Sequence, residues 1–359
     1  YSSTLGVCST TTTYDLAARG PDAVIPNNSN IVARISSPGI SGPITLAGSL
    51  TNQIFAVRQN TGTDAVISTL SGTTNKILQT YGLFITDGQG SVTFGEKVGD
   101  GFLSSLIASE GLLLDVDGTN GILTLNTPIA DIGGSVVAKK YGSGKVVLAA
   151  QNTYSGVTTV YEGTLLIQST NALGTTAGNT VVNTGAVLEV AGSIAPGAEP
   201  VTLYGTLSSQ SGVNICAGAI TLVNGSMIDV GAPSLLLVSG STTGSGILSK
   251  MGGGTLRFNA DPNSTGLYVL NAGTVELNYS GTQDAPIYIA PGATLRELLS
   301  NCLHDSMTIT NNGTFDMRAS DTMGMLVGSG RVTVGTGVSA TLAIGNEGSK
   351  IATFSGVIE

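Results

Sequence analysis

The sequence predicts an all-β protein built as a parallel β-helix, or β-solenoid, with an irregular N-terminal arm or cap. A glycine-led unit recurs about every 20 residues, and the residues after each glycine alternate between apolar and polar without helical periodicity. This period matches one coil of a stacked solenoid, in which alternation at period two sends every second side chain into the interior. The alternative is a β-sandwich of regular hairpins, with turn signals about every 8 to 12 residues.

The glycine-led unit consists of a glycine, a small or polar residue and an alternating apolar stretch. Its clearest copies begin at Gly163, Gly185, Gly205, Gly225, Gly273, Gly292 and Gly313. Neighbouring glycines are separated by 22, 20 and 20 residues in the first group and by 19 and 21 in the second. Because glycine tolerates a positive φ and close backbone approach, we expect these residues at the corners of coils, directly before strands.

The composition supports a large, ordered β core. Of 359 residues, 51 are glycine, 41% are hydrophobic and 10% are charged, and the mean hydropathy is +0.30. A disordered chain buries far less apolar surface than this. The net charge of −9 argues against nucleic acid or an anionic membrane as a partner. No apolar run reaches the length of about 18 residues that a spanning helix needs, so we expect no direct membrane insertion.

The repeat divides the chain into two regions. Residues 1–40 lack the period and contain a threonine-rich segment and three prolines, so we expect an extended N-terminal arm or cap there. Residues 41–359 form the predicted parallel β-helix. Residues 295–304 have apolar spacing suited to one or two helical turns, which predicts a short helical excursion from a coil. The chain begins at Tyr1 without a methionine, so we expect a processed or trimmed product.

One segment carries a recognisable motif. Residues 139–170 contain a Lys-x-Gly-x-Gly start at Lys140, the segment Asn152-Thr-Tyr-Ser-Gly156 and the corner Gly163-Thr-Leu. The segment resembles the autotransporter-associated β-strand repeat of bacterial passenger domains. A decayed copy at residues 250–277 begins at Lys250, with Asp-Pro-Asn-Ser in place of Asn-Thr-Tyr.

The resemblance implies a right-handed parallel β-helix on a secreted or surface-exposed bacterial protein. It does not imply an enzyme, since protease members of this class carry a separate catalytic domain with a serine motif. The sequence Gly-Asp-Ser-Gly of such a motif does not occur here.

Two segments have residues that could form binding loops. The segment 152–156 is either a binding loop or a solenoid corner in which asparagine and threonine satisfy backbone groups, and we favour the corner. The segment from Asp115 through Asp117 to Asn120 resembles the start of a calcium loop. Because a later acidic ligand is absent from it, we favour a solvated turn.

Three sets of side chains are candidates for the outer surface of the coils. The first set is the acids Glu189, Asp229, Glu276 and Asp316, which occur at nearly the same coil phase and are candidates for lining one face. The second is the basic cluster Lys139, Lys140 and Lys145, interpreted as a solvated corner. The third is Tyr154, Tyr161 and Tyr204, which could stack on sugar rings if they point outward.

Cysteine and histidine chemistry is sparse. The single histidine, His304, leaves no material for a catalytic triad, and the three cysteines lie too far apart for a zinc motif. Cys216 and Cys302 are 86 residues apart, about four coils, so we predict that they do not pair. We therefore predict no catalytic, cofactor-binding or metal site.

The sequence as a whole predicts a non-enzymatic extracellular rod of a bacterial cell surface, structural or adhesive in function. Its predicted partners are copies of itself, joined head to tail into fibres, or a host or matrix surface. The chain ends on residues 352–359, which are similar to the opening of a further repeat, so we expect that edge to be completed from outside. The alternative function is a carbohydrate-binding or polysaccharide-degrading β-helix.

Overall fold

The fold is an all-β solenoid. The computed structural model describes residues 12–16, 23–36, 42–48, 50–71, 73–281, 285–345 and 353–359. Within these ranges there are no α-helices, and parallel strands stack as a β-solenoid of about 15 turns, which confirms the predicted fold class. The one antiparallel pair described joins β7 (Leu70–Ser71) to β8 (Thr74–Asn75), so the β-sandwich alternative is wrong.

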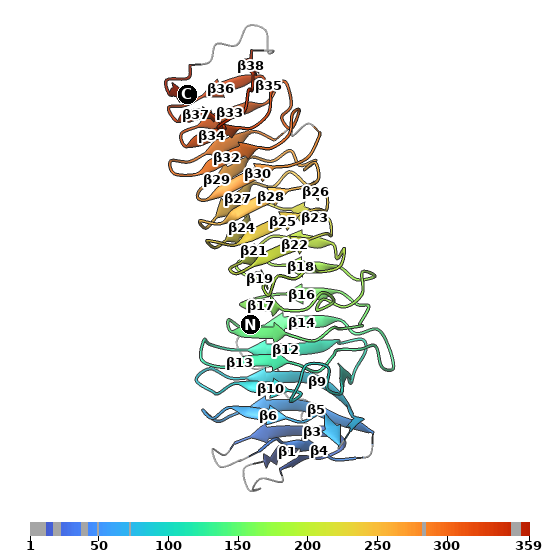
Figure 1. Ribbon diagram of the computed structural model, residues 1–359. Helices are drawn as coiled ribbons and strands as arrows, with labels where there is room; N and C mark the ends of the chain where they lie inside the picture. Colours follow the sequence, from blue (N-terminus) through green and yellow to red (C-terminus); the bar gives the residue numbers. More distant parts are fainter. Residues whose placement is uncertain are drawn as a thin grey trace. The chain divides into compact units, whose positions relative to one another are not determined.

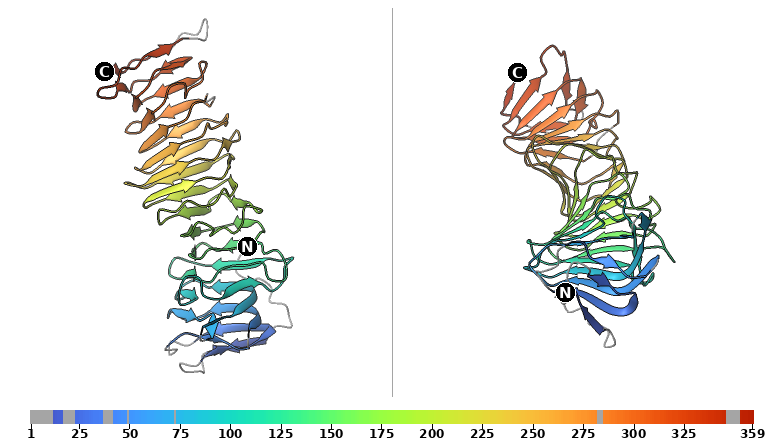
Figure 2. Two further views of the ribbon diagram at one scale, coloured as in Figure 1. Left: turned by 45° about the vertical axis from the view of Figure 1, so that its right-hand side comes forward. Right: turned by 60° about the horizontal axis from the view of Figure 1, so that its bottom comes forward.

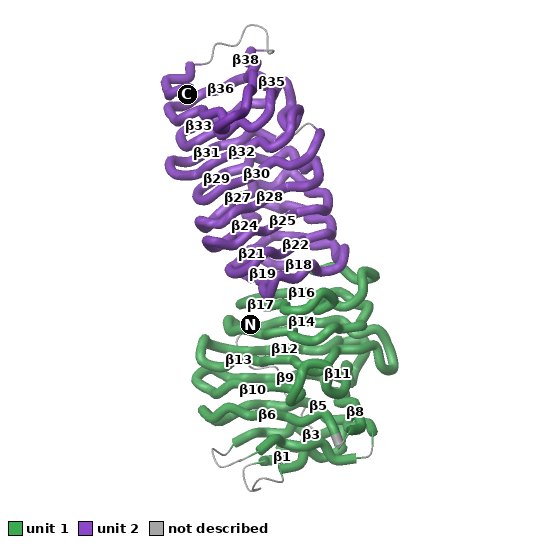
Figure 3. The backbone as a smooth tube through the Cα atoms, viewed as in Figure 1, with its two compact units in different colours: residues 1–180 green, residues 181–359 purple. Residues whose placement is uncertain are grey.

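The chain divides into two compact units, residues 1–180 and 181–359 (Figure 3). In unit 1, sheet I contains β1 (Thr12–Asp15), β3 (Asn28–Ile35), β5 (Thr51–Gln59), β9 (Ile77–Ile85), β12 (Leu112–Val116), β14 (Ala138–Tyr141) and β16 (Thr158–Val160), with β11 (Phe102–Ser105) beside β9. Sheet II contains β6 (Ala65–Ile67), β10 (Val92–Phe94), β13 (Ile122–Leu125), β15 (Lys145–Leu148) and β17 (Thr164–Ile167). A small parallel pair joins β2 (Val24–Ile25) to β4 (Thr45–Leu46).

The strands of unit 2 form three main sheets; coils near its start have a strand in each of them, and the coils of β29 to β34 have two strands each (Figures 1 and 2). Sheet III contains β20 (Val201–Leu203), β23 (Ile220–Leu222) and β26 (Thr242–Thr243). Sheet IV contains β19 (Val187–Val190), β21 (Thr206–Ser209), β24 (Ser226–Val230), β27 (Leu248–Met251), β29 (Tyr268–Leu270), β31 (Ile287–Ile289), β33 (Thr308–Asn311) and β36 (Met325–Val327). Sheet V contains β22 (Val213–Cys216), β25 (Leu235–Val238), β28 (Thr255–Phe258), β30 (Thr274–Leu277), β32 (Thr294–Glu297), β34 (Thr314–Met317), β37 (Arg331–Val334) and β39 (Val357–Ile358). A separate pair joins β35 (Asp321–Met323) to β38 (Leu342–Ile344), and β18 (Thr180–Val182) spans the residues at which the units divide.

Strands are present within the first 40 residues. β1 pairs in parallel with β3, and β3 pairs in parallel with β5, so these described residues are part of the stack. Residues 1–11, with Cys8, lie outside the described part of the chain. The division into an arm or cap and a β-helix beginning at residue 41 stays a prediction.

The core of each coil comes from the inward positions of the strands. In sheet V, one inward row is formed by Leu236, Leu256, Val275, Leu295, Phe315 and Val332, each at most 2% exposed. Burying one such side chain contributes about 1.5–3 kcal/mol. Identical register from strand to strand stacks these side chains, so every coil closes on the same interior.

The helical excursion predicted for residues 295–304 is wrong. Leu295 and Glu297 belong to β32 and point inward, while Arg296 points outward. The pairing of β32 with β30 and β34 continues the sheet through this segment. The period-two pattern of the neighbouring coils therefore decides the local structure, and the helix-like spacing of the leucines does not.

The predicted corner glycines are confirmed at Gly163 and Gly185, which have φ values of 63° and 81°. The two corners differ in packing. A Cβ at Gly163 would meet the carbonyl oxygens of Gly144 and Gly142, on the preceding coil, whereas a Cβ at Gly185 would enter open space. Gly163 therefore combines a left-handed backbone with close approach between coils.

We expect Gly163→Ala to lower the free energy of unfolding by about 3 kcal/mol, because a strained φ and a backbone overlap act together. Gly185→Ala is the matched control and should cost about 1–2 kcal/mol, since only the φ is strained. Urea denaturation of the two variants measures the difference. Equal losses would show that contact with the preceding coil contributes nothing.

Candidate functional site

The lysine of the repeat motif lies inside the solenoid. Lys140 points inward on β14 and is 1% exposed. Its Nζ donates hydrogen bonds to the carbonyl oxygens of Tyr141 and Gly142 at 2.6 Å and of Glu162, on the next coil, at 3.1 Å. Burial lowers the pKa of Lys140 to about 8, opposed by nearby carboxylates. The interpretation of this lysine as part of a solvated corner is therefore wrong, because strand alternation turns it inward.

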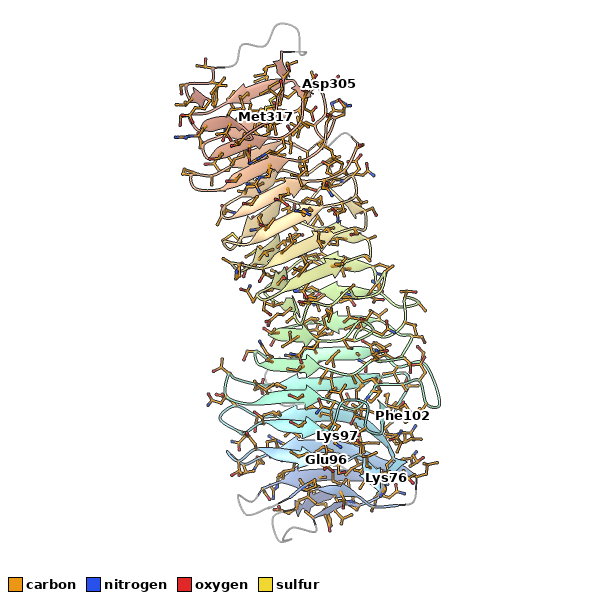
Figure 4. All side chains as sticks on the ribbon, viewed as in Figure 1. Lys76, Glu96, Lys97, Phe102, Asp305 and Met317 are labelled. Carbon is orange, nitrogen blue, oxygen red and sulfur yellow. The ribbon has the colours of Figure 1, made fainter. Side chains whose placement is uncertain are left out.

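The decayed copy repeats this contact. Lys250 is 1% exposed, and its Nζ donates to the carbonyl oxygens of Met251, Gly252 and Ala272 at 2.7, 2.9 and 3.1 Å. Lys76 (Figure 4) is also buried and donates to Leu46 O at 2.5 Å. In both motif copies the ammonium bridges two successive coils and satisfies carbonyl groups that the corner leaves unpaired.

The segment 152–156 is a structural corner. Asn152 is 3% exposed, accepts a hydrogen bond from the N–H of Ile129 at 2.8 Å and donates to Ala172 O. Tyr154 is fully buried, and its hydroxyl lies 2.6 Å from Thr158 Oγ1. These side chains close the coil, so Tyr154 does not present its ring to a sugar.

The decayed copy makes the same hydrogen bond with exchanged residues. Ser264 Oγ lies 2.5 Å from the hydroxyl of Tyr268, and both side chains are buried. Ser264 and Tyr268 occur 110 residues after Tyr154 and Thr158, respectively. The tyrosine has moved from the loop to the strand while its small hydroxyl partner has moved from the strand to the loop.

We expect Tyr154→Phe to cost about 1–3 kcal/mol of stability, because the Thr158 hydroxyl loses its partner in a buried site. The double variant Tyr154→Ser with Thr158→Tyr reproduces the arrangement of the decayed copy. The double variant should lose less unfolding free energy than the two single variants lose in sum, by about 1 kcal/mol or more. Strictly additive losses in a thermal or urea double-mutant cycle would contradict a transferable hydrogen bond.

The other two tyrosines considered for sugar stacking differ in exposure. Tyr161 stacks on Tyr141 with ring centroids 4.4 Å apart and an interplanar angle of 5°, which covers one face of its ring. Tyr204 is 38% exposed. Burial, followed by interaction with Tyr161, raises the pKa of Tyr141 to about 12. Of the three, Tyr204 is therefore the one with substantial exposure.

The aspartates of the calcium-like segment lie at the end of β12. Asp115 is half-buried on this strand, and Asp117 follows it. Burial raises the pKa of Asp115 to about 6, with Asp117 and Glu162 adding to the rise and Lys140 opposing it. Throughout the described ranges, no group of three or more His, Cys, Asp or Glu side chains is placed to hold a metal ion.

The four outward acids do not share one face. Glu189 and Asp229 belong to sheet IV, and Glu276 and Asp316 belong to sheet V. Two of the four, Glu276 and Asp316, therefore share one outward face, and the other two lie on a different sheet. Their similar coil phase arises because each coil contributes a strand to both sheets, and these strands present equivalent outward positions.

The two acids of sheet V lie in a charged row. Strand register places Arg257, Glu276, Arg296 and Asp316 side by side on β28, β30, β32 and β34. Arg257 Nε donates to Glu276 at 2.6 Å, Arg296 donates to Glu276 at 3.0 Å and to Asp316 at 2.7 Å, and Arg318 donates to Asp316 at 2.9 and 3.0 Å. We call the outward surface formed by these five residues the arginine face.

The arginines of this face lie over the acids. The side chains of Glu276 and Asp316 are 7% and 8% exposed, whereas those of Arg257, Arg296 and Arg318 are 32%, 33% and 37% exposed. Burial would raise the pKa of Asp316, but hydrogen bonds and charges from Arg318 and Arg296 bring it below its ordinary value. The groups that solvent contacts on this face are therefore mainly guanidinium groups.

A buried acid pair lies near β35. Glu297 points inward beside Met317 (Figure 4) and is fully buried. Burial raises its pKa to about 9, and the neighbouring Asp321 adds to the rise. Asp321 accepts hydrogen bonds from the backbone N–H groups of Cys302, Leu303 and Thr322 at 2.8, 3.2 and 2.7 Å. Glu297 is therefore a neutral acid at pH 7, and Asp321 is the member of the pair held by N–H donors.

Cys216 and Cys302 are free thiols. The Cys302 side chain is buried, with Sγ 2.9 Å from Leu299 O and 3.1 Å from Tyr279 O. Burial is the main cause that raises the pKa of both thiols to about 12. These are inert, structural cysteines.

Sequence reasoning missed the arginine face and the inward Glu297. Except for Arg318 and Asp316, the partners in the arginine face are separated by 19 or 20 residues, one coil period, so the repeat itself carries the signal. Strand alternation likewise identifies Lys140 and Glu297 as inward. Among the described residues, no helix has the length and apolar character to cross a membrane.

The fold and the inward motif lysines define a parallel β-solenoid whose coils are joined by buried ammonium groups. The family model described as the passenger-associated-transport-repeat matches residues 139–167. The chain is 31% identical over 252 residues to the adhesin BmaC autotransporter of Brucella suis biovar 1 (strain 1330). This match covers 63% of the chain and 7% of the relative's length. No solved structure matches.

The chain is thus an autotransporter-passenger-like β-helical protein, and the predicted family resemblance is confirmed. Both comparisons support a secreted, surface-exposed protein. The segment 250–277 is not covered by the family model, so its status as a second family repeat stays a prediction.

Proposed function

We propose that this chain is a non-enzymatic, adhesive β-helical segment of a bacterial cell-surface protein. The observation that carries the proposal is its similarity to an autotransporter adhesin over 252 residues. The motif residues are all used inside the coil: Lys140 and Asn152 hold successive turns together, and Tyr154 bonds to Thr158 within its own turn. The outward positions are therefore available for recognition without cost to the fold.

The outward acids support a non-enzymatic function. Polysaccharide hydrolysis needs two carboxyl groups with separated acid and base roles. The carboxyl groups of Glu276 and Asp316 are both engaged by arginines, and the pKa of Asp316 is lowered, so Asp316 does not have the raised pKa that a general acid requires.

Adhesion is tested with the purified 359-residue chain coupled to beads. We expect the beads to be retained on host cells or on extracellular matrix, and beads carrying the heat-unfolded chain to be lost. Retention no greater than that of albumin-coated beads on both surfaces would contradict the adhesive function.

Head-to-tail assembly is the second candidate function. It is favoured by β39, where Val357 and Ile358 are 52% and 68% exposed beside β37. Assembly predicts light scattering that rises with concentration and is abolished by deleting residues 1–20. A chain that stays monomeric at high concentration would contradict it.

A further inference from the structure

We propose that the arginine face binds a carboxylated polysaccharide, that is, a polymer of uronic acids. The inference rests on the proposed adhesive function and names the chemistry of its partner. It concerns unit 2 alone, because all five residues of the face lie on or beside sheet V.

The first argument is the sign of the exposed charge. The chain carries a net charge of −9 and has seven arginines. Four of these seven, Arg257, Arg296, Arg318 and Arg331, lie on or beside sheet V. Since the two acids of the arginine face are at most 8% exposed, the surface that a partner contacts is cationic in a protein that is otherwise acidic.

The second argument is preorganisation. Glu276 holds both Arg257 and Arg296, and Asp316 holds both Arg296 and Arg318, by bonds of 2.6–3.0 Å. Most of the rotamer entropy of these long side chains is therefore already lost before a ligand arrives. These bonds use Nε and one terminal nitrogen of each guanidinium. Guanidinium is planar and has five N–H donors, a geometry that suits carboxylate oxygens.

The third argument is the periodicity of the face. Adjacent strands lie about 4.8 Å apart. Arg257 and Arg296 lie on alternate strands, so these two arginines are about 10 Å apart along the stack and recur like charges on a linear polymer. Beside the charged row, strand register aligns four hydroxyl side chains, those of Thr255, Thr274, Thr294 and Thr314. A polyuronate chain lying along the stack would place carboxylates against the arginines and sugar hydroxyls against the threonines.

The same features disfavour a second copy of this chain as the occupant. Two arginine faces brought together would oppose guanidinium to guanidinium, because the acids lie beneath. A neutral glycan would leave the cationic row without a counterpart. Charge complementarity therefore selects an anionic polymer.

The test measures binding of the intact chain to polygalacturonate, heparin and dextran at low and high salt. We expect polygalacturonate to bind, dextran not to bind, and added salt to weaken binding by screening. The variant R257Q/E276Q removes an arginine together with its acid, so net charge is unchanged, and should weaken polygalacturonate binding at least tenfold. R318Q/D316N is a second such variant at the other end of the row, used if the first fails to give the circular dichroism of the wild type.

The matched control is R34Q/D15N in unit 1, which removes another arginine–aspartate pair, exposed by 41% and 43%. We expect this variant to bind as the wild type does. Unchanged binding by both arginine-face variants would overturn the proposal, as would equal binding of dextran. Binding of heparin without polygalacturonate would overturn the carboxylate assignment. If the beads adhere to cells but the chain does not bind polygalacturonate, this inference is wrong and the proposed adhesive function is still supported.

Discussion

We expect Lys140→Met to lower the free energy of unfolding by about 3–5 kcal/mol, although methionine fills nearly the same space. The ammonium of Lys140 donates to three carbonyl oxygens inside the coil, and methionine offers no donor to any of them. Buried carbonyl groups left without a partner each cost about 1–3 kcal/mol. One of the three belongs to the next coil, so the loss also weakens stacking.

The control for this variant is Lys139→Met on the same strand. Lys139 is half-exposed, and its Nζ donates to Glu110 O at 2.7 Å in an exposed bond. We expect its replacement to change the free energy of unfolding by less than about 1 kcal/mol. The measurement is urea denaturation of both variants followed by circular dichroism. If Lys140→Met were as stable as Lys139→Met, the lysine would be a space-filling residue and its three bonds would be energetically neutral.

The fold could be predicted because its determinants are local and periodic. The corner glycines and the alternation after Gly163 depend on backbone geometry and on one buried face, both of which the sequence shows directly. The failed helix at residues 295–304 shows the limit of local reasoning. In that segment, the pairing of β32 with β30 and β34 decides the structure, although the spacing of its apolar residues would also suit two helical turns.

The polar clusters were harder to predict because charge and strand phase give conflicting indications. Lys140 and Glu297 occupy inward positions, but charged residues are almost never fully buried unless they are paired. Lys140 is paired with carbonyl groups at a corner, and Glu297 is paired with Asp321. Both sets of partners are fixed by tertiary structure. The arginine face could have been found by searching for opposite charges one coil apart. The sequence does not show which sheet of the solenoid each strand joins.

Glu297 makes the stability of unit 2 depend on pH in a direction opposite to that of a salt-bridged acid. Its ordinary pKa is 4.5, and in the folded protein burial and Asp321 raise this pKa to about 9. Between these values the folded state keeps a proton that the unfolded state has released. The contribution of Glu297 to stability is therefore complete below pH 4.5 and is lost as the pH rises toward 9. The maximal slope is about 1.4 kcal/mol per pH unit, and the total is on the order of several kcal/mol.

We expect Glu297→Gln to remove this dependence, because glutamine has the shape of the protonated acid and does not ionise. The variant should match the wild type near pH 5 and become progressively more stable than it toward pH 9, by roughly several kcal/mol at the upper end. Glu189→Gln, at an outward position on β19, is the control and should leave the pH profile unchanged. Urea denaturation at pH 5, 7 and 9 gives the three differences. A difference between Glu297→Gln and the wild type that stays constant from pH 5 to 9 would mean that Glu297 titrates alike in both states. In that case Glu297 would not be a buried neutral acid beside Asp321.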